Sequence, residues 1–396
     1  MDEEKPGYYF DWAATSPPDK EILRESLELS MENWGNPSSL HTKGKEAKLL
    51  LEAARKECAE VLGVKSETLF FTSGGTESNH IPLLSVLNKP QKGHVLFSSI
   101  EHPSVHEMAA ELSKCGWEVE EIPSNKDGII TPENVKKSLK ASTVFVSVMA
   151  VNNETGAIQP IEEIADMLVE VSKGKRRPKF HTDCVQAAGK IPFFLNHEGI
   201  DSASFSAHKI SGPRGIGLLY SKNTIEPFLR GGGQENGTRS GTENVFAAIA
   251  FSKVLKKYFI SEKNPAAEKR FLEQKKTTSE FVKKLSLLKG CVVIPGERIL
   301  NPENYSPWII QASFDNIPGQ VMLRALDSEG FCISTGSACG SKKDERPVLN
   351  AMKVPSDTAK NSVRFSFGFS TSENDMEKLF EKIEEICKKF NGKNIN

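Results

Sequence analysis

The chain has 396 residues, a formal net charge of −1 and 38% hydrophobic residues, so it can hold two domains of ordinary globular composition. So balanced a charge gives no electrostatic footprint for nucleic acid or for an acidic membrane surface. No apolar run approaches the length that spans a bilayer, and the first stretch, MDEEKPGYYF, lacks the features of a signal peptide. Seven cysteines without pairing intervals argue against disulfides, and no Cys/His cluster has zinc spacing. We expect a cytoplasmic protein with no nucleic-acid partner, no membrane partner and no metal.

The N-terminal region is predicted to alternate short regular elements with polar turns. Residues 8–18 predict a short strand that ends in a turn, and a helix is expected to start at Pro18 and Asp19. Residues 34–44 (WGNPSSLHTKG) form an irregular polar loop, which is either a plain connector or the cover of a site. The apolar spacing over 45–62 predicts an amphipathic helix.

A glycine-rich turn follows the next predicted strand, residues 69–72. The turn Ser73-Gly74-Gly75 precedes a helix that starts near Thr76. Free backbone N–H groups at a helix start, with glycines that allow close approach, form an anion site. The stretch lacks the lysine of a P-loop and the spacing of a dinucleotide fingerprint, so one phosphate fits better than two. The alternative is a turn without a ligand.

Polar residues also follow the later strands, predicted at 94–100, 143–150 and 180–185. His102 can stack on a flat ring or move a proton, or it is only a helix cap or a core histidine. Asp183, inside an apolar strand, needs a cationic or N–H partner. In a pyridoxal site that partner is the ring nitrogen, and the alternative role is a helix cap.

The stretch 202–220 (SASFSAHKISGPRGIGLLY) predicts a strand that stops at His208 and Lys209, a Gly/Pro loop and a second strand. A lysine at the end of a buried strand is costly unless something holds or neutralises it. Desolvation lowers the pKa of such an amine and suits it to a Schiff base with an aldehyde. Ser206 and His208 beside it suit a phosphate close to that aldehyde, as in pyridoxal phosphate. The alternative is a loop lysine in solvent.

The order of the predicted elements indicates an α/β protein with a smaller second part. Strands alternate with helices over residues 65–220, which favours a mostly parallel sheet covered on both faces. Residues 231–244 contain too much glycine to pack as a core element. The remaining predicted elements are helices at 245–260 and 262–288, strands at 308–314, 330–333 and 362–367, and a final helix through Met376 and Ile386.

Ten motifs in order, along nearly the whole chain, resemble those of the cysteine desulfurases. These are pyridoxal-phosphate enzymes of the class-V, aminotransferase-like fold (fold type I). The resemblance implies a large domain at 16–259 with a mostly parallel seven-stranded sheet, and a small α+β domain made of 1–15 and 260–396. The motifs are FDWAATSP, GNPSS, FTSGGTES, EHPSV, VNNETG, HTDCVQAAGK, SFSAHKISGPRGIG, GGGQENGTRSGT, STGSACGS and SVRFSFG.

The resemblance assigns roles by position. It implies a Schiff base at Lys209, a pyridine-nitrogen partner in Asp183 and a ring-hydroxyl partner in Gln186. It implies that His102 stacks on the ring and takes part in catalysis. The phosphate is assigned to Gly75, Thr76, Ser206 and His208, with Thr242 from the other subunit of a homodimer. The substrate, L-cysteine, is assigned to Asn36, Asn153 and Arg364, and Asn153 also contacts the cofactor; arginine suits a bidentate grip on a carboxylate.

Cys339 matches the sulfur-accepting cysteine of the family. Its neighbours in STGSACGS are nearly all small, as in a mobile loop, so the alternative of a buried apolar cysteine fits poorly. The residues that follow, GSKKDERPVLNAM, resemble the longer-loop subgroup, which passes sulfur to scaffold or carrier proteins, including those of iron–sulfur cluster assembly.

Two departures from the family pattern and two rival functions remain open. Cys184-Val185 replaces smaller residues beside Asp183, which indicates a packing change. Members that serve the housekeeping iron–sulfur scaffold usually carry a longer tail than the one after Phe390, so the sulfur acceptor stays open. The rivals are a selenocysteine lyase, or another lyase or aminotransferase of this fold, and a silent scaffold for sulfur carriers. Retention of Lys209 and Cys339 argues against the scaffold.

Overall fold

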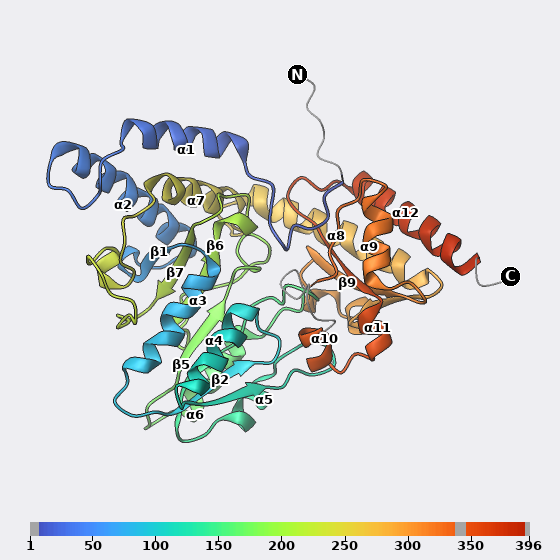
Figure 1. Ribbon diagram of the computed structural model, residues 1–396, viewed down its shortest axis with the longest axis horizontal. Helices are drawn as coiled ribbons and strands as arrows, with labels where there is room; N and C mark the ends of the chain where they lie inside the picture. Colours follow the sequence, from blue (N-terminus) through green and yellow to red (C-terminus); the bar gives the residue numbers. More distant parts are fainter. Residues whose placement is uncertain (1–7, 337–345, 393–396) are drawn as a thin grey trace.

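The computed structural model describes residues 8–336 and 346–392 as two lobes, each built around its own sheet (Figure 1). Cys339 lies outside the described residues. The larger lobe has a seven-stranded sheet of order β1-β7-β6-β5-β4-β2-β3, in which β7 is antiparallel to both neighbours and the other pairings are parallel. Its strands are β1 (Leu69–Thr72), β2 (His94–Ser98), β3 (Glu118–Ile122), β4 (Thr143–Ser147), β5 (Lys179–Asp183), β6 (Ser202–Ser206) and β7 (Gly217–Ser221). The predicted α/β class and the mostly parallel seven-stranded sheet are confirmed.

Helices cover both faces of this sheet, and side chains on both faces of its central strands β4 and β6 are buried accordingly. Local signals set several of the helix ends. Asp19 caps α1 by accepting the Ile22 N–H at 3.3 Å, Gly63 ends α2 in the left-handed conformation, and Thr131 caps α5. The helices are α1 (Lys20–Glu32), α2 (Thr42–Leu62), α3 (Gly75–Leu84), α4 (Pro103–Lys114), α5 (Pro132–Ser138), α6 (Ile161–Val171) and α7 (Val245–Tyr258).

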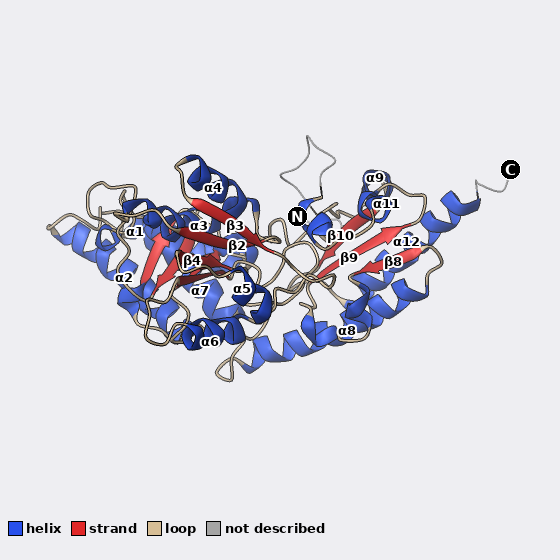
Figure 2. Ribbon diagram, turned by 90° about the horizontal axis from the view of Figure 1, so that it is seen from below, coloured by secondary structure: helices blue, strands red, loops and turns tan. Residues whose placement is uncertain are grey.

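The smaller lobe contains a three-stranded antiparallel sheet of order β10-β9-β8 with a separate core that includes Phe281, Trp308 and Phe365. Figure 2 shows α8 below this sheet and α9 above it. The N-terminal segment joins this lobe, because Tyr9 bridges to Cys332 and Phe10 packs in its core. The elements are α8 (Pro265–Leu287), β8 (Cys291–Ile294), β9 (Ile309–Phe314), α9 (Gly319–Asp327), α10 (Pro347–Ala351), α11 (Ser356–Lys360), β10 (Ser362–Ser366) and α12 (Glu373–Gly392).

Three local predictions were wrong, and one strand was missed. Residues 8–18 and 330–333 are not strands, since each contributes only isolated bridges, at Tyr9 and Asp11 and at Cys332. The edge strand β3 was not predicted, because its sequence EVEEI is acidic and half-exposed rather than apolar. The 231–244 segment does pack into the interior, because Glu235 and Thr238 are buried, Glu235 in an ion pair with Arg55. In the described part of the chain, no helix is long and apolar enough to cross a membrane.

Candidate active site

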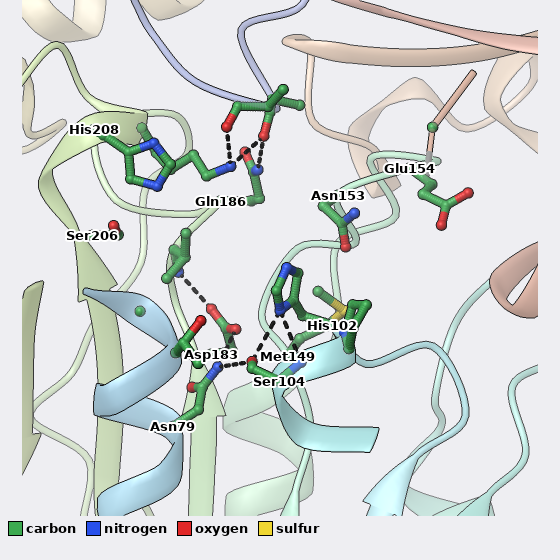
Figure 3. Close-up of a pocket in the computed structure, with 18 of the residues that line it drawn as sticks. Asn79, His102, Ser104, Met149, Asn153, Glu154, Asp183, Gln186, Ser206 and His208 are labelled. Carbon is green, nitrogen blue, oxygen red and sulfur yellow. Dashed lines mark hydrogen bonds between the residues drawn. The ribbon is translucent and has the colours of Figure 1, made fainter. Parts of the chain in front are cut away.

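The cavity of interest lies where the parallel strands of the large sheet end. The segments that follow β1, β2, β4, β5 and β6 all meet at that edge, as expected for ligand sites in α/β proteins. The N-terminal segment and the small lobe complete the wall through Ala13, Ala14, Gly336 and Arg364. The cavity has a volume of about 290 Å³ (Figure 3). Its lining includes Gly75, Thr76, Asn79, His102, Ser104, Asn153, Asp183, Gln186, Ser206, His208 and Lys209.

A buried carboxylate lies at the base of the cavity. Asp183, the last residue of β5, is 4% exposed and accepts hydrogen bonds from the Asn79 amide at 2.8 Å and from the Val185 N–H at 2.9 Å. Asn79 in turn contacts His181 Nε2 at 3.0 Å. Burial lowers the pKa of His181 to about 3, so this histidine is neutral at physiological pH. Asp183 therefore has N–H partners that fix its position, as the sequence required, while it still lines the cavity.

His102 serves both as a helix cap and as a wall of the cavity. It is the N-cap of α4, where Nδ1 accepts the Ser104 N–H at 3.1 Å, and its ring also lines the cavity (Figure 3). Burial and, more weakly, nearby Lys209 lower the pKa of His102, although Asp183 opposes the shift. A neutral imidazole held in a fixed orientation can stack on a flat ring or accept a proton.

Lys209 follows β6 and reaches across the cavity toward the N-terminal segment. Its Nζ donates to the carbonyl oxygens of Ala13 at 2.6 Å and Ala14 at 2.7 Å. The amide Nε2 of Gln186 donates to the same Ala13 carbonyl at 2.9 Å. Backbone carbonyls of the N-terminal segment thus hold both side chains, and Figure 3 shows Gln186 at this wall of the cavity.

The N-terminus of α3 forms the anion end of the cavity. Gly75 and Thr76 open the helix, and Ser206 and His208 line the cavity with them. A Cβ on Gly75 would lie 2.8 Å from Val185 Cγ2, so glycine is needed for this close packing. Burial and the adjacent cation Lys209 lower the pKa of His208 to about 3, so it faces this end as a neutral ring. Orphan N–H groups at a helix start suit one phosphate.

Arg364 of β10 links the small lobe to the cavity. Its guanidinium donates to the Asp11 carboxylate at 2.7 Å and to the carbonyl oxygens of Asn153 at 2.8 Å and Gly336 at 3.1 Å. Within the described residues, Arg364 Nε and Asn153 Oδ1 are buried without a hydrogen-bond partner. A substrate with both a carboxylate and an amino group would supply an acceptor for the first and a donor for the second.

The structure gathers most of the predicted site residues, but not all. Asn36 and Thr242 are exposed and do not line the cavity of their own chain, so their assignments stay predictions. The two residues that depart from the family pattern, Cys184 and Val185, lie in different surroundings: Cys184 is buried in the core and Val185 lines the cavity. Sequence reasoning missed Asn79, Ser104 and the Ala13 carbonyl. The motif FTSGGTES adjoins Asn79, EHPSV contains Ser104 and FDWAATSP contains Ala13, but only the folded chain shows their partners.

These groups fit pyridoxal 5′-phosphate. A lysine amine suits the aldehyde, a buried carboxylate suits the ring nitrogen, and a helix N-terminus with Thr76, Ser206 and His208 suits the phosphate. The unpartnered atoms Arg364 Nε and Asn153 Oδ1 remain for an amino-acid substrate.

Known proteins share this fold and sequence pattern. The Aminotransferase class-V family matches residues 8–379. A "NifS/IcsS protein homolog" from Lactobacillus delbrueckii subsp. bulgaricus is 39% identical over 96% of this chain and 97% of that protein. "Cysteine desulfurase IscS" from Dictyoglomus turgidum is 36% identical over 96% and 95%. A solved structure described as a NifS-like protein is 35% identical, with a TM-score of 0.86 over 96% of this chain and 99% of that one. The chain therefore belongs to the class-V aminotransferase family of pyridoxal-phosphate enzymes, among its cysteine desulfurases of the NifS and IscS type.

Proposed function

We propose that this enzyme converts L-cysteine to L-alanine and keeps the removed sulfur as a persulfide on Cys339. One observation carries the proposal. Lys209, Asp183 and Arg364 converge on a single cavity, and Gly336, which lines that cavity, precedes Cys339 by only three residues. The segment that contains the nucleophile therefore starts at the wall of the site.

The cofactor-binding residues have distinct tasks. Lys209 would bind the cofactor aldehyde, Asp183 would hold the ring nitrogen in its protonated form, and His102 would stack on the ring. Gln186 would donate to the ring hydroxyl, while Gly75, Thr76, Ser206 and His208 would hold the phosphate. When bound, pyridoxal phosphate draws electrons from the substrate carbon next to the amino group.

The substrate residues would orient L-cysteine by its polar ends. Arg364 would bind the carboxylate through Nε and the second N–H of Nη2, which make no hydrogen bond to the described residues. Asn153 would accept a hydrogen bond from the amino group. Asp11 and the two carbonyl oxygens hold the other three N–H groups of the guanidinium, so its orientation toward a carboxylate is fixed before substrate arrives. Asn36 is proposed to contact the substrate from the polar loop between α1 and α2.

The sulfur step balances without an external oxidant. The Cys339 thiolate attacks the substrate sulfur, an S–S bond forms and the C–S bond breaks. The electron pair of the broken bond stays on the carbon, which takes a proton and becomes the methyl group of alanine. A reducing thiol then cleaves the persulfide and releases sulfide, or an acceptor protein takes the sulfur.

Four of the other cysteines are poorly suited to this role. Burial raises the pKa of the Cys58 and Cys184 thiols, and it raises the pKa of Cys291 to about 12. Burial also raises the pKa of Cys332, the cysteine that precedes Cys339 in the chain. Fewer thiolates at these sites mean slower attack on a substrate sulfur.

We further propose a homodimer in which Thr242 reaches the phosphate of the partner subunit. Large apolar side chains are exposed around α1, α2 and the segment before Thr242, which suits burial against a second copy. These side chains are Leu27, Met31, Trp34, Leu40, Leu49, Phe228 and Leu229. We retain as proposals the domain division at 16–259, a cytoplasmic location and a sulfur-acceptor protein such as an iron–sulfur scaffold or carrier.

The test is an assay of the purified enzyme with L-cysteine. With a thiol reductant present, we expect equimolar alanine and sulfide. Without it, we expect no more than a few turnovers per active site, because the persulfide blocks Cys339. Alanine formation that needs no reductant and survives Cys339→Ser, with faster turnover of selenocysteine, would replace this function with that of a selenocysteine lyase.

A further inference from the structure

A second lysine lies behind the wall of the active-site cavity. Lys190 follows β5 in the same motif as Asp183 and Gln186, and only 2% of its surface is exposed. Its backbone carbonyl accepts the indole N–H of Trp308 at 2.6 Å, which fixes the turn against the small lobe. A lysine so deeply buried is destabilising unless it makes a specific interaction.

The partner of Lys190 is a cavity residue. Its Nζ donates to Oε1 of Gln186 at 2.6 Å, which is its only hydrogen-bond partner among the described residues. Lys190 does not itself line the cavity, so its effect on a bound cofactor has to pass through Gln186 or through its charge. Burial and the nearby cations Lys209 and Arg364 lower the pKa of Lys190.

The two neighbours of the Gln186 amide fix its orientation from both ends. A lysine amine directed at Oε1 and a carbonyl oxygen directed at Nε2 are compatible with only one assignment of the amide. The Nε2 group has two N–H donors, and Ala13 uses one of them. The other donor is available for the cavity, which Gln186 lines.

We propose that Lys190 is a positioning residue, which holds the Gln186 amide so that its N–H group faces the cofactor. This inference rests on the proposed contact between Gln186 and the ring hydroxyl.

Loss of Lys190 would leave Gln186 Oε1 buried without a donor. A buried acceptor without a partner is costly, so the amide would turn toward another donor. The neighbouring donor is Lys209, which shares the Ala13 carbonyl with Gln186. Such a turn would remove the N–H group from the cofactor and engage the lysine that binds it. The affected site would therefore be the cofactor site, although Lys190 does not touch it.

The experiment compares four holoenzymes: wild type, Lys190→Met, Gln186→Leu and the double variant. Equilibrium dialysis gives the dissociation constant of pyridoxal phosphate, and a pH titration gives the midpoint at which the absorbance of the bound cofactor changes. We expect Lys190→Met to weaken cofactor binding about tenfold in the wild-type background, and less than about twofold when Gln186 is already Leu. Its pH midpoint should move in the same direction as that of Gln186→Leu.

The outcomes separate this inference from the proposed role of Gln186. If Gln186→Leu leaves both readouts unchanged, the proposed ring contact fails and the inference fails with it. Suppose that Gln186→Leu changes cofactor affinity and the pH midpoint. If Lys190→Met then changes neither, or changes them equally in the wild-type and Gln186→Leu backgrounds, only the inference about Lys190 is overturned. Urea unfolding provides the structural control. A Lys190→Met protein that is less stable but has the wild-type affinity and pH midpoint would show that Lys190 only supports packing, which also overturns the inference.

Discussion

A buried ion pair holds the glycine-rich segment that leads to Thr242. Glu235 accepts from Arg55 Nη1 at 2.6 Å and Nη2 at 2.8 Å, and from the Phe71 N–H of β1 at 2.7 Å. The Arg55 and Glu235 side chains are 8% and 1% exposed. The pair thus ties α2 and β1 to a segment that would otherwise have little to pack against.

Arg55→Met should be strongly destabilising, because it leaves the Glu235 carboxylate buried with a single N–H partner. Removal of one partner from a buried pair typically reduces the unfolding free energy by about 3–5 kcal/mol. The matched control is Arg230→Met, which breaks the Arg230–Glu226 pair nearby in the chain. That pair is 64% and 63% exposed, so its loss should change stability by less than about 0.5 kcal/mol.

Urea unfolding followed by tryptophan fluorescence measures both changes. Addition of Glu235→Gln to Arg55→Met should recover at least half of the loss, because the neutral amide still accepts the Phe71 N–H without a buried charge. The interpretation of Glu235 as a buried charge is refuted if Arg55→Met is as mild as Arg230→Met, or if the double variant is less stable than the single one.

Three further predictions concern the cofactor, pH and assembly. Lys209→Ala should lose the absorbance of the bound cofactor and all turnover; retained colour and activity would exclude it as the cofactor-binding lysine. Burial, with a contribution from Asp183, raises the pKa of Glu101 from 4.5 to about 8. Between pH 4.5 and about pH 8, the Glu101 carboxyl is protonated in the folded state but ionised in the unfolded state, so stability falls as the pH rises. Wild type should therefore lose about 3 kcal/mol of stability from pH 4.5 to 7 relative to Glu101→Gln, and parallel pH profiles in urea unfolding would contradict this. Thr242→Ala should weaken cofactor affinity, whereas a fully active monomer would remove Thr242 from the site.

The ends of the strands could be predicted well from the sequence. Apolar runs followed by polar loops mark where parallel strands stop. Those loops contain His102, Asn153 and Lys209, and Asp183 is the last residue of its strand; the structure gathers all four in one cavity. The amphipathic helix predicted at 45–62 spans Thr42–Leu62 in the structure, because its apolar residues recur at helical spacing.

Long-range partners could not be predicted in this way. Asn79 lies inside a helix that the sequence marks only at its start, and its partner Asp183 is 104 residues away. The Ala13 and Ala14 carbonyls that hold Lys209 belong to the backbone, so no side chain identifies them. Glu235 is similar: its sequence surroundings indicate a solvated loop, and only the arrival of Arg55 from α2 makes its burial possible.

The location of the transferred sulfur tests the proposed chemistry most directly. The enzyme is treated with L-cysteine without reductant, digested and examined by mass spectrometry. We expect one added sulfur on the peptide that contains Cys339. Cys339→Ser should keep the bound cofactor and bind cysteine, yet form no persulfide and little alanine. Added sulfur on the peptide of Cys184 or Cys332, or undiminished alanine formation by Cys339→Ser, would contradict the assignment of Cys339 as the nucleophile.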